Sequence, residues 1–135
     1  MQPYQEEYIA NLKKNSELTD PGYRDRQSFE AYLERQLLYK GQREKIVERN
    51  MALLRENLFP LLDRLYEADP KELLELREFA ATLFDGRTEL DIGLFCQIHQ
   101  ALLDRARIQK DRDAMICELY WLGIGYNSLC AKLLG

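Results

Sequence analysis

Residues 88–106 read TELDIGLFCQIHQALLDRA, and this stretch decides the fold class. Thr88 is followed three residues later by Asp91, a pattern that resembles a helix-starting capping box with Asp in place of the usual Glu. Apolar residues then recur at spacings of three and four, the period of a helix with one buried face. They are Ile92, Phe95, Ile98, Leu102 and Ala106. The stretch therefore predicts an amphipathic helix that packs against other helices.

The same period extends toward the N-terminus. Residues 4–14 predict a first helix, and the pattern from Asp25 to Leu58 predicts a long second helix or two shorter ones. Gly41 lies inside this second pattern, where glycine costs about 1 kcal/mol relative to alanine. That cost is too small to break a helix whose flanks both pack. We therefore expect the long helix to be continuous through Gly41.

Proline marks two further boundaries. Pro60 lacks a backbone donor and clashes with the preceding turn, so we expect a kink or a restart at residues 57–60, with helix resuming through Leu65. Asp69-Pro70 combines a capping Asp with proline at the first helical position and predicts the start of the next helix. Asp85-Gly86 predicts where that helix ends.

Length and composition agree with a single helical domain. The chain has 135 residues, of which 46% are hydrophobic and 31% are charged, a balance typical of globular proteins. Only seven glycines and four prolines are present, which favours helix over sheet. Short connections between helices make successive helices antiparallel neighbours. We predict one all-α domain over residues 1–135, an antiparallel bundle or tetratricopeptide-like solenoid of about five to six helices.

Several classes of function find no support in the sequence. The net charge of −4 and the mixing of Glu with Lys and Arg over residues 40–49 argue against a nucleic-acid partner. No glycine-rich phosphate loop or other cofactor motif occurs, so we expect no cofactor. The first residues have neither a basic start nor an apolar run, which indicates a cytoplasmic protein.

Cys96 and His99 are the residues closest to a catalytic or metal-ligating pattern. They lie one helical turn apart, so a thiolate activated by histidine is conceivable, but two ligands are too few for a tight metal site. The cysteines are three in number and lack C-x-x-C spacing, which indicates reduced, buried thiols and neither a disulfide framework nor zinc. We expect no metal site and a structural role for Cys96.

The last helix, which Asp111 or Asp113 is expected to cap, carries an unusual apolar stretch. Residues 118–132 read ELYWLGIGYNSLCAK, and their thirteen uncharged central residues are too few for a membrane span of about 20. The aromatic residues cover more of the helix than one neighbouring helix can bury. Core packing is one explanation and a groove for a partner is the other. The candidate interaction surface consists of Leu119, Tyr120, Trp121, Gly123 and Tyr126.

Part of this stretch resembles a known repeat. Leu119-x-x-Leu122-Gly123-x-x-Tyr126 is similar to the W-x-x-L-G-x-x-Y opening of a tetratricopeptide repeat, with Leu119 at the tryptophan position. In that repeat the glycine admits the neighbouring helix. The resemblance implies that a further helix or another protein packs here.

A broader resemblance covers most of the chain. The segments YIANLKKNSELTDPGY (8–23), FEAYLERQLLYKGQREKIVERNMALL (29–54), ENLFPLLDRLYEADP (56–70) and the run over 75–123 resemble the N-terminal helical region of GGDEF diguanylate cyclases and HD-type signalling proteins of anaerobic Gram-positive bacteria. The GGDEF signature itself is absent from residues 1–135, so no catalytic residue is carried over. The resemblance implies a non-catalytic regulatory module, an N-terminal fragment of a longer multidomain protein.

Two main hypotheses follow. In the first, the chain is an input module that controls cyclic di-GMP synthesis by self-association, as a homodimer, or by contact with a downstream output domain. In the second, it is a free-standing helical adaptor for a protein or peptide, bound near Trp121. A small enzyme that uses Cys96 and His99 is the third possibility.

Overall fold

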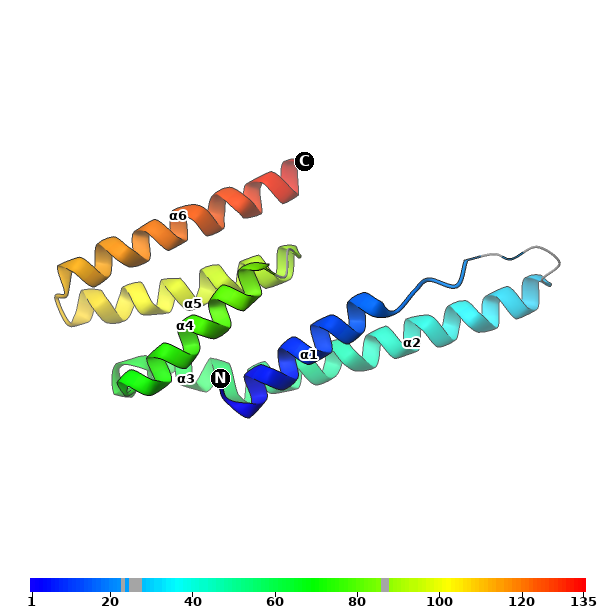
Figure 1. Ribbon diagram of the computed structural model, residues 1–135, viewed down its shortest axis with the longest axis horizontal. Coiled ribbons are helices and arrows are strands. Elements are labelled where there is room, and N and C mark those ends of the chain that lie inside the picture. Colours follow the sequence, from blue (N-terminus) through cyan, green and yellow to red (C-terminus); the bar gives the residue numbers. More distant parts are fainter. Residues whose placement is uncertain (23, 25–27, 86–87) are drawn as a thin grey trace.

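The computed structural model describes residues 1–22, 24, 28–85 and 88–135, and all regular structure in these ranges is helical. The predicted all-α fold with antiparallel neighbours is confirmed. The elements are α1 (Pro3–Glu17), α2 (Phe29–Leu53), a π-helical turn (Leu54–Leu58), α3 (Phe59–Asp63), a 3-10 turn (Leu65–Glu67), α4 (Pro70–Asp85), α5 (Glu89–Ile108) and α6 (Arg112–Leu134). Figure 1 shows α1 beside α2 at one end of the molecule and α4, α5 and α6 together at the other.

The helix starts follow the sequence signals. The Thr88 side chain accepts a hydrogen bond from the backbone N–H of Asp91 at 3.1 Å, and Asp69 accepts one from the N–H of Glu72 at 2.8 Å. Of the two candidate caps for the last helix, Asp111 is the one that accepts from the α6 backbone. These side chains satisfy amide groups that have no partner within the first helical turn.

The long second helix is continuous through Gly41, as predicted, and begins after the Ser28 cap. Regular α-helix is interrupted before Pro60 by the π-helical turn, which confirms the expected disturbance at this proline. The side-chain amide of Asn57 in this turn donates to the carbonyl of Leu53, the last residue of α2, at 3.1 Å. The helix that was expected to continue through Leu65 ends at Asp63, and a 3-10 turn follows over Leu65–Glu67.

Two predicted boundary signals, Asp25 and Gly86, lie outside the described residues.

The core lies mainly between α4, α5 and the π-helical turn. All five residues of the predicted inward face of α5 are buried, and so are Leu76, Ala80 and Leu83 of α4. The remaining large buried apolar side chains are Tyr8, Leu53, Leu54, Leu58, Leu61, Leu65, Phe79, Leu94, Leu103 and Leu122. Helix α6 joins this core from one side only, through its contact with α5.

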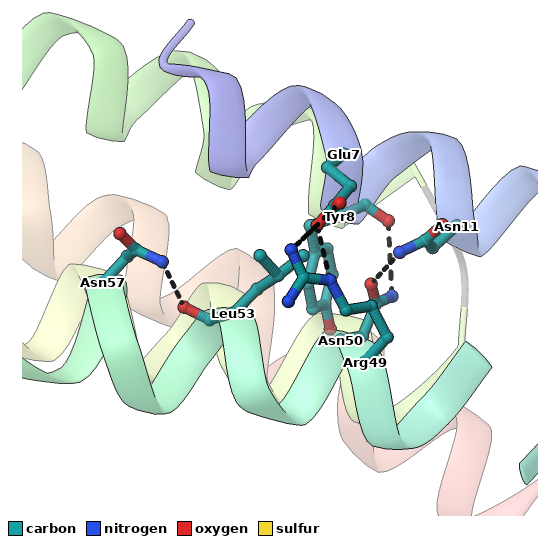
Figure 2. Close-up of polar contacts among 7 residues, drawn as sticks. All are labelled: Glu7, Tyr8, Asn11, Arg49, Asn50, Leu53 and Asn57. Carbon is teal, nitrogen blue, oxygen red and sulfur yellow. Dashed lines mark hydrogen bonds and ion pairs between the residues drawn. The ribbon is translucent and has the colours of Figure 1, made fainter. Parts of the chain in front are cut away.

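Polar contacts join α1 to α2 (Figure 2). Asn50, which is buried, accepts a hydrogen bond from the amide of Asn11 at 2.9 Å and donates to the carbonyl of Tyr8 at 3.3 Å. At the surface, the adjacent residue Arg49 makes two hydrogen bonds to the carboxylate of Glu7, at 3.0 and 3.1 Å. The buried amide therefore sets the register of the two helices, and the exposed ion pair lies beside it.

The N-terminal half of α2 differs from expectation. The helical period that starts near Asp25 includes Phe29, Leu33 and Leu37 and predicts a packed face, but all three side chains are exposed. In Figure 1 this half of α2 extends beyond the end of α1 and away from the other helices. Apolar residues do recur there at helical spacing, but none of the described helices packs against them.

The substitution Asn50→Ala tests the buried contact between α1 and α2. It removes the partner of the Asn11 amide and the additional hydrogen bond to the Tyr8 carbonyl at a buried position, so we expect the free energy of unfolding to fall by about 1–3 kcal/mol. The matched control Arg49→Ala removes only the exposed ion pair and should cost less than about 1 kcal/mol. Urea denaturation followed by circular dichroism measures both. Equal losses in the two variants would contradict this assignment.

Candidate functional site

Helix α6 contacts the rest of the protein along one narrow stripe. Glu118, Leu122 and Gly125 are its buried residues. A Cβ atom at Gly125 would lie 2.7 Å from Cys96 Sγ and 3.0 Å from the ring of Phe95. Glycine at this position therefore lets the backbone of α6 approach α5 closely, and most of the remaining circumference of α6 is left open.

A regular apolar row runs along the open part of α6, and we call it the α6 seam. Its members recur at alternating spacings of three and four, the pattern with which one helix packs against another in a coiled coil. They are Ile116, Leu119, Gly123, Tyr126, Cys130 and Leu133, and all six are exposed. Between Asp113 and Lys132 the only charged residue of α6 is Glu118, whose side chain is buried, so the seam carries no exposed charge from Ile116 to Cys130.

The five residues of the predicted interaction surface do not all lie together. Leu119, Gly123 and Tyr126 belong to the α6 seam, and a Cβ atom at Gly123 would meet nothing within 4 Å. The glycine of the repeat-like motif thus faces open space, and it is Gly125 that admits a neighbouring helix.

Trp121 lies roughly 200° around the helix from Leu119. Its ring stacks on the imidazole of His99, with centroids 6.1 Å apart and 27° between the ring planes, and it is 39% exposed. Tyr120 is exposed and makes an edge contact with Trp121 at 5.4 Å. The aromatic residues of this helix are thus divided between two flanks.

Sequence reasoning missed the group that orients α6. Glu118 is 1% exposed, and each of its carboxylate oxygens has a partner on a different helix. Arg77 of α4 donates to Oε1 at 2.5 Å, and the Nδ1–H of His99 in α5 donates to Oε2 at 2.5 Å. One buried carboxylate thereby connects α4, α5 and α6.

The surroundings of Glu118 favour its charged form. Burial by itself raises the pKa of this carboxyl, but the hydrogen bonds from His99 and Arg77, together with their positive electrostatic influence, outweigh burial and lower the pKa from its usual value. Arg77 is partly exposed, so water still solvates the outer part of the cluster. The carboxylate is therefore ionised at neutral pH and holds both donors toward α6.

The cysteines are free, but the expectation that all three are buried is wrong. Cys117 and Cys130 are exposed on α6, because that helix buries only one stripe, and Cys96 alone is buried. Burial raises the pKa of the Cys96 thiol, the opposite of what activates a nucleophile. In the described parts of the chain, no group of three or more His, Cys, Asp or Glu side chains is arranged to hold a metal ion.

Comparison with protein-family models, curated proteins and solved structures finds no match in any of the three. Across residues 1–22, 24, 28–85 and 88–135, no helix is both long and apolar enough to span a membrane. The case for a function therefore rests on the geometry of α6 and on the resemblance described above.

The substitution Glu118→Gln tests the buried cluster through pH. The pKa of Glu118 is lowered by folding, so its stabilisation is complete above the usual Glu value of 4.5 and is lost as the pH falls through the lower folded value. At neutral pH the variant should be less stable by on the order of 3 kcal/mol, because Arg77 and His99 lose a charged partner. This difference should shrink in acid.

The comparison is made between wild type and variant at each pH, by urea denaturation. In this comparison the contributions of other titrating groups to the pH dependence cancel. One such group is Asp91, whose pKa is raised by burial although the hydrogen bond from Thr88 opposes the shift. A stability difference that stays constant from neutral pH into acid would contradict the assigned charge state.

Proposed function

We propose that this chain is a non-catalytic helical interaction module that pairs with a second copy of itself through the α6 seam. Following the resemblance, it serves as the cytoplasmic input region of a bacterial signalling protein and controls a downstream domain that synthesises cyclic di-GMP. The observation that carries the proposal is the exposed, uncharged heptad row on α6. A row of this kind is the usual seam of a helix pair.

The order of residue sizes along the seam favours an antiparallel pair. If two α6 helices run in opposite directions about a point between residues 124 and 125, Gly123 of one copy faces Tyr126 of the other. In the same register Leu119 faces Cys130, and Ile116 faces Leu133. The glycine is then opposite the largest residue of the row, which is the alternation of large and small side chains that fills an interface without voids.

Charge does not oppose this arrangement. The exposed charges of α6 lie near its ends, where Arg112 and Asp113 are in the first turn and Lys132 is in the last. In an antiparallel pair the last turn of one copy therefore approaches a first turn whose two charges, those of Arg112 and Asp113, are of opposite sign. The central part of the pair contains no exposed charged side chains that would repel one another.

A pairing of this kind provides a means of control. Two-fold pairing of an input module sets the distance between the two domains attached to it, and cyclic di-GMP synthesis responds when output domains are brought together or held apart. Because the seam has no buried polar contact of its own, its strength depends on apolar area and can change with small movements of α6.

The substitution Leu119→Glu tests the seam. It places a charge in the middle of the apolar row, so we expect the wild-type chain to be dimeric at high concentration and the variant to be monomeric, with the apparent affinity reduced by at least about tenfold. Sedimentation velocity over a range of concentrations measures this.

Leu74→Glu is the matched control, because Leu74 on α4 is 58% exposed and Leu119 is 57% exposed. This variant should dimerise like the wild type. A wild-type chain that stays monomeric at all concentrations, or equal effects of the two substitutions, would contradict pairing through the α6 seam. Such a result would favour a different protein as the occupant of this surface.

The link to cyclic di-GMP is tested in the natural gene product. If it carries a cyclase domain, Leu119→Glu should change its rate of cyclic di-GMP synthesis, and Leu74→Glu should not. A gene product that dimerises through α6 but has no effect on cyclic di-GMP would leave the pairing intact and refute the assigned signalling role.

A further inference from the structure

A cavity lies on the flank of α6 opposite the seam. It has a volume of about 370 Å³ and is bounded by α4, α5 and α6. Clefts that bind small molecules span about 300–1,000 Å³, so the volume is sufficient for a compact ligand. Trp121 is the part of α6 that contributes to it, and neither Leu119 nor Tyr126 does. The cavity is therefore separate from the proposed pairing surface.

Aromatic rings form its wall. The rings of Phe84 and Phe95 have centroids 5.0 Å apart, Phe95 and His99 are 4.5 Å apart, and His99 stacks on Trp121. The rings thus follow one another from α4 across α5 to α6. Such a wall suits the flat body of an aromatic ligand, and the faces of aromatic rings also attract cations.

The two charged residues that line the cavity differ in whether their charge is balanced. Arg77 donates to the buried carboxylate of Glu118, which offsets its positive charge. Asp85 is exposed at the C-terminal end of α4, and within the described residues its carboxylate has no hydrogen bond or ion pair. The C-terminal end of a helix is itself partly negative. The end of the cavity near Asp85 therefore attracts a cation.

The opposite end offers hydrogen-bond donors. The guanidinium group of arginine has five N–H donors, and the described contacts of Arg77 use only Nη1. Asp85 lies eight positions after Arg77, which corresponds to roughly 12 Å along the axis of α4. A ligand that uses both ends must be elongated, with an acceptor oxygen at one end and a cation at the other.

We propose that this cavity binds a small aromatic amine, with its ammonium group at Asp85, its ring against Phe84, Phe95 and Trp121, and an acceptor oxygen at Arg77. Tyramine has this arrangement of groups and is the probe for the test. 4-Hydroxyphenylacetate is its matched control, because it keeps the phenol and replaces the cationic end with a carboxylate.

Binding is measured by isothermal titration calorimetry on the whole chain, and the emission of Trp121, the single tryptophan, reports occupancy of the cavity. We expect tyramine to bind saturably with one molecule per chain and to change that emission. 4-Hydroxyphenylacetate should bind at least about tenfold more weakly, because Asp85 repels its carboxylate.

Asp85→Asn should reduce the affinity for tyramine by at least about tenfold. Asp63→Asn is the control variant, since Asp63 is also an exposed aspartate at the last position of a helix but does not line this cavity. It should bind tyramine like the wild type. Three results would overturn the proposal: no saturable binding of tyramine, equal or tighter binding of 4-hydroxyphenylacetate, or unchanged affinity in Asp85→Asn. None of them bears on pairing through Leu119, so the two proposals fail independently.

Discussion

The arrangement of the three C-terminal helices depends on a single buried carboxylate. A charge placed out of water is strongly destabilising unless donors surround it, and Glu118 meets this requirement with one donor from α4 and one from α5. Few rotations of α6 about its own axis allow both contacts at once. The carboxylate therefore determines which side of α6 faces the core, and with it which side faces outward.

The other features of α6 agree with that orientation. Gly125 and Leu122 lie on the same side as Glu118, and the glycine allows the backbone to come close to Cys96 and Phe95. Trp121 then covers His99 on one flank, and the α6 seam is exposed on the other. The position of α6 at the outside of the α4–α6 group (Figure 1) leaves the seam accessible to another molecule.

Local signals in the sequence were sufficient for the fold class and for most helix boundaries. The caps at Asp69 and Thr88, the disturbance at Pro60 and the inward face of α5 depend on neighbours within one or two turns, and the structure agrees with each of them. Contacts between residues far apart in the chain were not predictable in this way. Glu118 is separated from Arg77 by 41 positions and from His99 by 19, and an isolated Glu in an apolar stretch gives no sign of its partners.

The exposed apolar residues show a related limit. Periodicity indicates that Leu33 and Leu37 of α2, or Leu119 of α6, lie on an apolar face, but it does not say whether this chain or another molecule covers that face. For the same reason the sequence of α6 predicted an interaction surface but did not show that its residues lie on two different flanks of the helix. Only the structure separates Trp121, which lines the cavity, from Leu119 and Tyr126, which lie on the seam.

The central claim is that α6 presents its seam to a second copy in antiparallel register, and disulfide trapping tests it most directly. The experiment uses Leu119→Cys in a Cys117→Ser background, mild oxidation, and mass spectrometry of the linked peptides. The account predicts a disulfide between position 119 of one copy and Cys130 of the other, and no covalent dimer when Leu119 is retained. A Cys130–Cys130 disulfide, which the proposed antiparallel register does not allow because it places Cys130 opposite position 119, or a dimer that forms no link between positions 119 and 130 would contradict it.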